Sequence, residues 1–125
     1  MGEGSTVVVL GASPKAGRYS NMAVRQLKNS GYRVIPVNPG HSIVEEIDTV
    51  ATLRDISEPV HTLTLYVNPV WSERMEDDII SLKPGRVIFN PGTESARLRE
   101  SLSNSGIPYL EACTLIMLST EQFDK

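Results

Sequence analysis

The stretch Val7–Asn21, VVVLGASPKAGRYSN, decides the fold of this chain. Its first four residues form an apolar run typical of a buried strand, and a loop of small residues with two cations, Lys15 and Arg18, follows directly. We expect a helix to begin near Ser20. Small residues let backbone N–H groups approach an anion closely, and the N-terminus of a helix adds partial positive charge. The stretch therefore predicts a site that holds a pyrophosphate.

Length and composition indicate one soluble globular domain. The 125 residues are enough for a single core, and 40% of them are hydrophobic and 22% charged. A net charge of -3 with scattered basic residues argues against a protein that coats nucleic acid. The single Cys113 excludes an internal disulfide and a zinc cluster, and fits a reducing, cytoplasmic compartment. No apolar stretch reaches about 18 residues, so we expect no transmembrane span and no membrane partner.

Strand-like and helix-like segments alternate along the chain. The expected strands are residues 6–10, 33–37, 62–67, 86–89 and 108–110. The expected helices are residues 20–30, 72–82, 94–103 and 112–118, with Ser20 or Asn21 capping the first and Ser72 the second. Between residues 41 and 60 we expect a short strand near Ile43 and a turn of helix at Leu53–Ile56. This alternation predicts an open parallel α/β sheet of the Rossmann-like type with helices on both faces. It forms a single domain over residues 6–125, preceded by a flexible N-terminus at residues 1–5.

Three of the expected strands run into an Asn-Pro pair. The pairs are Asn38-Pro39, Asn68-Pro69 and Asn90-Pro91. Because the carboxyl ends of parallel strands meet at one edge of the sheet, these turns would wall one cleft together with the loop at residues 11–17. The alternative is structural, since Asn and Pro commonly end strands and begin turns.

The loop departs from the usual dinucleotide-binding pattern in two respects. A Rossmann NAD site normally shows G-x-G-x-x-G and an acidic residue at the end of the second strand. Here Ser13 stands at the second glycine position and Gly17 comes one residue late. The second strand ends in Val37-Asn38-Pro39, with no carboxylate to bind a ribose diol. Both departures weaken an NAD site, and the sequence contains no P-loop motif.

These segments resemble the small stand-alone CoA-binding domain proteins. The fold of that family is similar to the N-terminal CoA-binding domain of the succinyl-CoA synthetase alpha subunit. The resemblance rests on residues 11–21 and 31–39, and continues through residues 52–56, 90–94 and 111–113. It implies a CoA-binding or acyl-CoA-binding protein. The absence of a carboxylate after the second strand agrees with this, because a carboxylate there would repel the 3′-phosphate that CoA carries on its ribose.

The resemblance also implies roles for particular segments. The loop would hold the pyrophosphate and its cations would face phosphate oxygens, while residues 37–39 would flank the adenine and ribose and residues 67–69 the pantetheine arm. The implied CoA-binding residues are Gly11, Ala12, Ser13, Lys15, Gly17, Arg18, Ser20, Asn21, Val37, Asn38, Pro39, Val67, Asn68 and Pro69. In one departure, the family often has a lysine after the Asn-Pro pair, where this chain has Gly40-His41. That leaves His41, Lys15 and Arg18 as the cations expected near the 3′-phosphate.

We expect binding rather than catalysis, because no nucleophile can be assigned an adjacent base. No metal site is expected either. Cys113 is interpreted as an inert buried thiol, or alternatively as a thiol near the open end of the cleft that forms a mixed disulfide with CoA. Trp71 either stacks on a ligand or packs in the core or an interface, and His61 is interpreted as structural.

Two further functions stay open from the sequence. The first is an NAD(P)-binding oxidoreductase or redox-sensor domain. The second is a regulatory partner of an acyl-CoA enzyme whose pocket has lost its ligand. The expected partners are a small-molecule nucleotide ligand and either a second copy of the chain or an acyl-CoA enzyme, with no nucleic acid.

Overall fold

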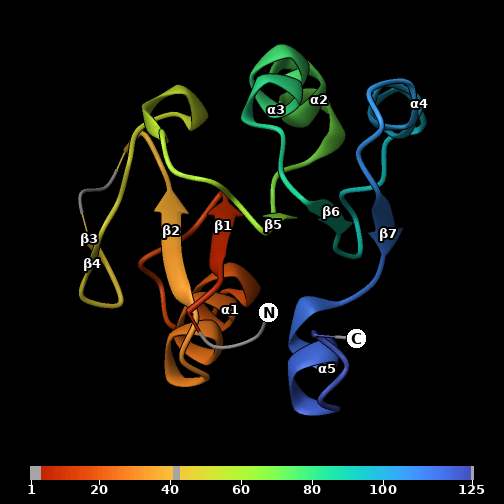
Figure 1. Ribbon diagram of the computed structural model, residues 1–125. Coiled ribbons are helices and arrows are strands. Elements are labelled where there is room, and N and C mark those ends of the chain that lie inside the picture. Colours follow the sequence, from red (N-terminus) through yellow and green to blue (C-terminus); the bar gives the residue numbers. More distant parts are fainter. Residues whose placement is uncertain (1–3, 41–42, 125) are drawn as a thin grey trace.

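The computed structural model describes residues 4–40 and 43–124, and its centre is a five-stranded parallel sheet (Figure 1). The strands of this sheet are β1 (Thr6–Leu10), β2 (Arg33–Val37), β5 (Thr62–Leu65), β6 (Arg86–Phe89) and β7 (Tyr109–Glu111). A separate antiparallel pair consists of β3 (Ile43–Val44) and β4 (Ile47–Asp48). The helices are α1 (Tyr19–Asn29), α2 (Pro69–Arg74), α3 (Glu76–Leu82), α4 (Ala96–Asn104), α5 (Thr114–Ser119) and the 3₁₀ turn η1 (Leu53–Asp55).

The order of the strands in the main sheet is β2-β1-β5-β6-β7. From β1 the chain moves outward to β2, and it then returns across β1 to add β5, β6 and β7 on the other side. The strand order therefore reverses between β1 and β5, where an open α/β sheet offers a crevice at the carboxyl ends of its strands. This topology confirms the predicted Rossmann-like α/β fold.

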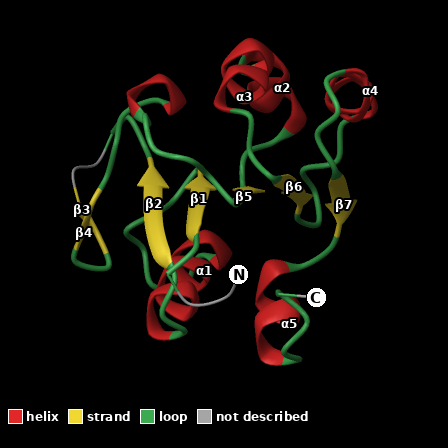
Figure 2. Ribbon diagram, in the orientation of Figure 1, coloured by secondary structure: helices red, strands yellow, loops and turns green. Residues whose placement is uncertain are grey.

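Helices cover both faces of the sheet (Figure 2). Helices α1 and α5 lie together on one face, whereas η1, α2, α3 and α4 lie on the other. Alternate side chains of β1 feed the two cores, because successive residues of a strand point to opposite faces. Val7 and Val9 pack with Leu27 of α1, and Val8 packs with Ile79 of α3 and with α4. The apolar run of β1 is thus buried on both sides, as a central parallel strand requires.

The helix starts differ from the sequence-based expectation. Helix α1 begins after Arg18 without a side-chain cap, so the prediction that Ser20 or Asn21 caps it is wrong. The predicted Ser72 cap is also wrong, because Ser72 is buried inside α2. Asn68 caps α2 instead, with its side-chain oxygen accepting the Trp71 N–H at 3.3 Å. The reason is Pro69, whose fixed φ suits the first helical position, where no N–H is needed.

Residues 72–82 do not form one helix. Two short helices, α2 and α3, meet at Met75 (φ −97°, ψ 11°). Other elements lie close to their expected positions: η1 is the predicted turn of helix, and Gly31 ends the α1 segment with φ +89°. Helix α4 begins after Ser95, whose hydroxyl accepts the Leu98 N–H at 3.0 Å, rather than at Glu94.

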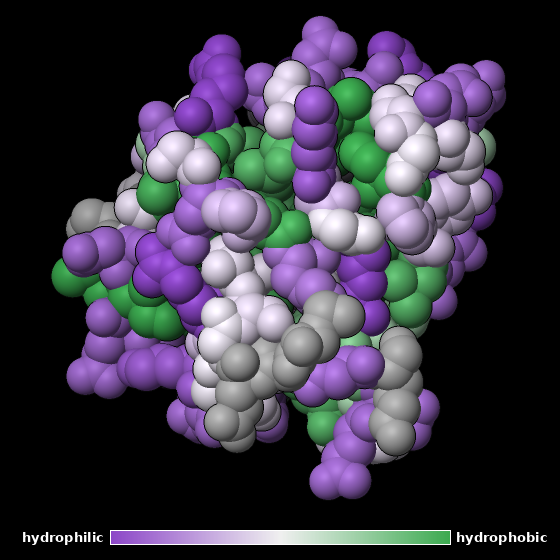
Figure 3. All heavy atoms as spheres, in the orientation of Figure 1, coloured by the Kyte–Doolittle hydropathy of each residue, from purple (hydrophilic) through white to green (hydrophobic). Residues whose placement is uncertain are grey.

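The surface is mostly hydrophilic on the face drawn in Figure 3, and the start of the described chain is tied to the end of α1 and the start of β2. Hydrophilic side chains cover most of the face seen in Figure 3, and a small apolar patch lies over the β3–β4 pair, where Ile43 is exposed. Residues 1–3 of the predicted flexible start lie outside the described residues. The N–H of Gly4 donates to the carbonyl of Gly31 (2.9 Å), and the carbonyl of Ser5 accepts from Arg33 (3.0 Å). Across residues 4–40 and 43–124, no helix has the length and apolarity needed to cross a bilayer.

Candidate functional site at the carboxyl edge of the sheet

Two cavities meet where the strand order reverses. The first, here called the α1 cavity, has a volume of about 510 Å³ and is lined by Gly11, Ser13, Lys15, Arg18, Tyr19, Ser20, Tyr66, Val67, Asn68, Pro91, Gly92 and Thr93. The second, the α2 cavity, has a volume of about 440 Å³ and is lined by Leu10, Gly11, Val37, Asn38, Pro39, Ala51, Thr52, Leu53, Arg54, Val67, Trp71, Arg74, Met75 and Asp78. Both are lined by Gly11 and Val67, so the two cavities adjoin at the ends of β1, β2 and β5, and they are together called the cleft below.

Gly11 is the point at which three strand ends come together. Its φ is +90°, and a Cβ added there would lie 2.8 Å from Val67 Cγ1 and 3.1 Å from the Tyr66 carbonyl oxygen. Its N–H donates to the Val37 carbonyl at 3.1 Å, and the same carbonyl accepts the Ala12 N–H at 3.2 Å. Only glycine combines this backbone conformation with such a close approach of β1 to β5.

The loop after β1 is tied down from both sides. Asn38 Nδ2 donates to the Ala12 carbonyl at 2.6 Å, and Asn21 Nδ2 donates to the Ser13 carbonyl at 2.9 Å. The Ser13 hydroxyl oxygen accepts the Lys15 N–H at 3.1 Å. These bonds leave the Ser13 O–H available as a donor on the wall of the α1 cavity, whereas Ala12 is fully buried and lines neither cavity.

Positive charge faces the α1 cavity. Lys15 and Arg18 are both exposed on its wall, and neither takes part in an ion pair among the residues that the structure describes. Ser20 lines the same cavity from the first turn of α1, where backbone N–H groups have no partner within the helix. Gly17 lies in the exposed turn before α1 and does not line the cavity. An anion in the α1 cavity would therefore meet two cations, a hydroxyl and a helix N-terminus.

The α2 cavity is mainly apolar, with two further cations at its edge. Val37 and Pro39 line one side of it, and Trp71, which is 52% exposed, lines another. The guanidinium of Arg74 lies 5.1 Å from the centre of the Trp71 ring, and Arg54 reaches the cavity from η1. Sequence reasoning did not single out either arginine. Arg54 lies within residues 52–56, which carry part of the family resemblance, but the sequence does not show that it lies near Arg74, because η1 and α2 meet the end of β2 only in the folded chain.

The three Asn-Pro turns lie along this cleft, as predicted, but their asparagine side chains bind protein groups. Asn90 is buried: its Nδ2 donates to Thr64 Oγ1 (2.6 Å) and to the Leu65 carbonyl (2.8 Å), and its Oδ1 accepts the Thr114 N–H (2.9 Å). Asn68 caps α2 and lines the α1 cavity, whereas its neighbour Pro69 lines neither. The turns thus form the walls of the cleft while their asparagines hold the walls in place.

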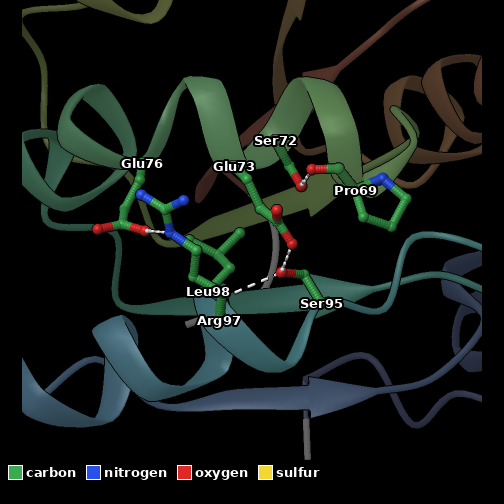
Figure 4. A network of polar contacts seen from close by, with 7 residues as sticks. All are labelled: Pro69, Ser72, Glu73, Glu76, Ser95, Arg97 and Leu98. Carbon is green, nitrogen blue, oxygen red and sulfur yellow. Dashed lines mark hydrogen bonds and ion pairs between the residues drawn. The ribbon is translucent and has the colours of Figure 1, made fainter.

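Helix α2, which carries Trp71 and Arg74, is held against α4 by polar contacts (Figure 4). The Ser95 hydroxyl donates to Glu73 Oε2 at 2.6 Å and at the same time accepts the first-turn N–H of α4. Arg97 Nε donates to Glu76 Oε1 at 3.2 Å, which joins α4 to α3. These contacts fix the position of the α2 wall of the cleft.

Within residues 4–40 and 43–124, the candidate nucleophiles lie away from the cleft or have no base beside them. Burial raises the pKa of Tyr66 to about 12, and its hydroxyl, near Thr64 and Thr114, makes no hydrogen bond of normal geometry within the described residues. Cys113 is half-buried before α5 and lines neither cavity, and His61, whose pKa is lowered by burial, bonds to Thr62 Oγ1 at 2.8 Å. His41 lies outside the described residues.

Comparison with known proteins supplies the family. The model of a family described as CoA binding domain matches residues 5–119. The chain belongs to this CoA binding domain family. The match confirms the resemblance inferred from the loop after β1 and the Asn-Pro turn after β2. As a member of this family, the chain carries its cleft at the switch point of a Rossmann-like sheet.

Solved structures share the fold along almost the whole chain. A crystal structure of an uncharacterized protein is 42% identical, with 96% of this chain and 98% of that chain covered and a TM-score of 0.90. A Thermus thermophilus protein is 31% identical, covering 96% and 91% of the two chains with a TM-score of 0.87. A dinucleotide-forming acetyl-coenzyme A synthetase from Ca. Korarchaeum cryptofilum is 18% identical over 88% of this chain and 26% of its own, with a TM-score of 0.74, and shares the fold.

One curated relative matches over a shorter stretch. An uncharacterized protein of Bacillus subtilis (strain 168) is 28% identical over 60 residues. The matched stretch spans 48% of this chain and 44% of the relative.

Proposed function

We propose that the cleft binds CoA or an acyl-CoA and that the protein acts as a binding protein for this ligand. One observation carries the proposal: two unpaired cations, Lys15 and Arg18, face a cavity that adjoins a second, mainly apolar one at Gly11. CoA has the matching composition, because a charged pyrophosphate joins an adenosine to a long pantetheine arm. Membership of the CoA binding domain family supports this assignment.

The two cavities suit different parts of the ligand. In this proposal the pyrophosphate lies in the α1 cavity, where Lys15, Arg18, the Ser13 hydroxyl and the start of α1 can stabilise its charge. The adenosine occupies the α2 cavity against Val37–Pro39, and the pantetheine arm leaves past Val67 and Asn68. Opposite charges at contact distance in a half-solvated cleft attract strongly enough to orient the ligand.

The chemistry of the described walls favours binding over catalysis. Nucleophilic catalysis needs a nucleophile with a base within hydrogen-bond reach. Among the described residues that line the two cavities there is neither a histidine nor a cysteine. We therefore place the protein among those that hold or present CoA rather than those that transform it, in preference to an NAD(P)-dependent oxidoreductase.

The test is calorimetric titration of the purified protein with CoA, acetyl-CoA and NAD. We expect CoA to bind and NAD to bind at least tenfold more weakly. Lys15→Ala and Arg18→Ala should each weaken CoA binding about tenfold, because a hydrogen bond to a charged group contributes about 1.5–3 kcal/mol. Both variants should also show a smaller dependence on salt.

The matched control is Arg99→Ala. Arg99 lies on α4, pairs with Glu111 and lines neither cavity, so its removal should leave CoA affinity unchanged. Tighter binding of NAD than of CoA would overturn the proposal. Unchanged CoA affinity in both the Lys15 and Arg18 variants would show that the phosphates lie elsewhere.

A further inference from the structure

Two arginines from different elements converge on the α2 cavity. Arg54 comes from η1 and Arg74 from the last turn of α2, and both line the cavity that also contains Val37 and Asn38 at the end of β2. No cation follows β2 directly, because Asn38-Pro39 leads into Gly40. The cations among the residues that line this cavity therefore come from η1 and α2.

Both guanidinium groups have N–H donors that are available to a ligand. Arg54 is exposed, and its Nε lies 3.9 Å from Asp78 Oδ2, which is a long contact for an ion pair. Arg74 rests over the Trp71 ring and makes no ion pair among the described residues. An arginine carries five N–H donors in a planar fork that matches two phosphate oxygens at once. Asp78 is the sole carboxylate among the described residues lining this cavity, so the charge there stays net positive.

The surroundings of the two arginines fit a nucleobase. Leu10, Val37, Leu53 and Met75 make the wall largely apolar, and the exposed face of Trp71 borders it. Flat aromatic bases stack favourably on indole rings. A cavity with an indole, apolar walls and two forked cations has the chemistry to hold an adenosine that carries a phosphate monoester on its ribose.

We propose that Arg54 and Arg74 bind the 3′-phosphate of CoA, with its adenine against Trp71. This inference rests on the proposed function and names the residues that distinguish CoA from ligands lacking that phosphate. A monoester phosphate carries close to two negative charges at neutral pH, so two guanidinium groups can neutralise it. NADP presents the same chemistry at the 2′ position of its ribose, and the test separates the two sources.

The test compares ligands with and without the 3′-phosphate. CoA and 3′-dephospho-CoA are titrated into the wild-type protein, the double variant Arg54→Ala/Arg74→Ala and the control Arg99→Ala. Binding is followed by calorimetry and by the fluorescence of Trp71, which is the chain's single tryptophan. We expect wild type and Arg99→Ala to bind CoA at least tenfold more tightly than dephospho-CoA. The double variant should bind both ligands with the affinity that wild type has for dephospho-CoA.

The outcomes separate this inference from the proposed function. If wild type binds CoA and dephospho-CoA equally, or if the double variant keeps the discrimination, the arginine assignment is overturned and CoA binding stands. If wild type binds neither ligand, both proposals fall. Adenosine 3′,5′-bisphosphate should bind more tightly than adenosine 2′,5′-bisphosphate, and the reverse order would overturn the assignment to the 3′-phosphate. Because both arginines are exposed, thermal melting of the double variant should match wild type, and the charge-conserving Arg54→Lys/Arg74→Lys variant should keep part of the discrimination.

Discussion

The turns that follow β5 and β6 share the dipeptide Asn-Pro, yet their asparagines do different work. Asn90 is 2% exposed and makes three hydrogen bonds, which join the ends of β5 and β6 to the start of α5. Asn68 is exposed, and its side chain accepts one backbone N–H at 3.3 Å to cap α2. The difference arises from what covers each turn, because the start of α5 packs on Asn90, whereas no element of residues 4–40 and 43–124 buries Asn68 in this way. The same dipeptide thus provides a buried hydrogen-bonding asparagine after β6 and a helix cap after β5.

Replacing Asn90 tests the comparison with the largest expected effect. Asn90→Ala leaves the Thr114 N–H and the Leu65 carbonyl without their side-chain partner in a buried setting. Buried groups that lose their partners cost about 1–3 kcal/mol each, so we expect the free energy of unfolding to fall by about 3 kcal/mol. Urea denaturation monitored by circular dichroism measures it. A decrease in the free energy of unfolding of less than about 1 kcal/mol would contradict the view that the Asn90 hydrogen bonds hold β5, β6 and α5 together.

The same measurement on Asn68 should give a much smaller loss. Asn68→Ala removes an exposed cap, which costs about 0.5–2 kcal/mol and typically about 1 kcal/mol. Asn68→Ser supplies another capping oxygen and should retain most of the stability. If Asn68→Ala proved as damaging as Asn90→Ala, the contrast between the two turns would be wrong.

The smallest effect at neutral pH is expected at Tyr66, next to the Asn90 network. Its buried hydroxyl has no partner of normal geometry within the described residues, so Tyr66→Phe should change the free energy of unfolding by less than about 0.5 kcal/mol. At high pH the two proteins should diverge. An unfolded tyrosine loses its proton near pH 10, whereas Tyr66 in the folded chain keeps it up to about pH 12.

Ionisation in that interval stabilises the unfolded state of the wild type and not that of Tyr66→Phe. The stability that Tyr66 contributes is therefore present below pH 10 and is lost as the pH rises towards 12. Urea unfolding from pH 8 to pH 11.5 measures the difference between the two proteins, in which the titration of all other groups cancels. Parallel curves would show that the Tyr66 pKa is not raised by burial.

The sequence predicts the centre of this molecule well. Val7–Leu10 is apolar at every position, which requires a strand buried on both faces, and the glycine after it marks a sharp turn. The strands and most of the helices can be predicted in the same way, because strand-like and helix-like patterns of apolar residues alternate along the chain. The predicted site residues Gly11, Ser13, Lys15, Arg18 and Ser20 do line one cavity, because all of them belong to one local segment.

The features that the sequence does not reveal depend on contacts between residues that lie apart in the chain. Ser72 is a reasonable cap from the sequence because serine often begins helices, but Pro69 already fits the first helical position one turn earlier. Arg54 and Arg74 lie in separate segments, and only the crossover from β2 to β5 brings both to the end of β2. The different burial of Asn68 and Asn90 likewise depends on α5, which comes more than twenty residues after Asn90.

The strand order β2-β1-β5 has a consequence for how this chain reaches its native state. Every pairing in the main sheet is parallel, so none of them forms as a local hairpin, and such non-local pairings make for slow folding. The walls of the α1 cavity come from residues far apart in the sequence, from Gly11 after β1 to Thr93 after β6. A nascent chain that ends before β6 therefore lacks the wall that Pro91, Gly92 and Thr93 give to this cavity. A ligand held there would stabilise the folded chain over the unfolded one, by about 2.7 kcal/mol at one hundred times its dissociation constant.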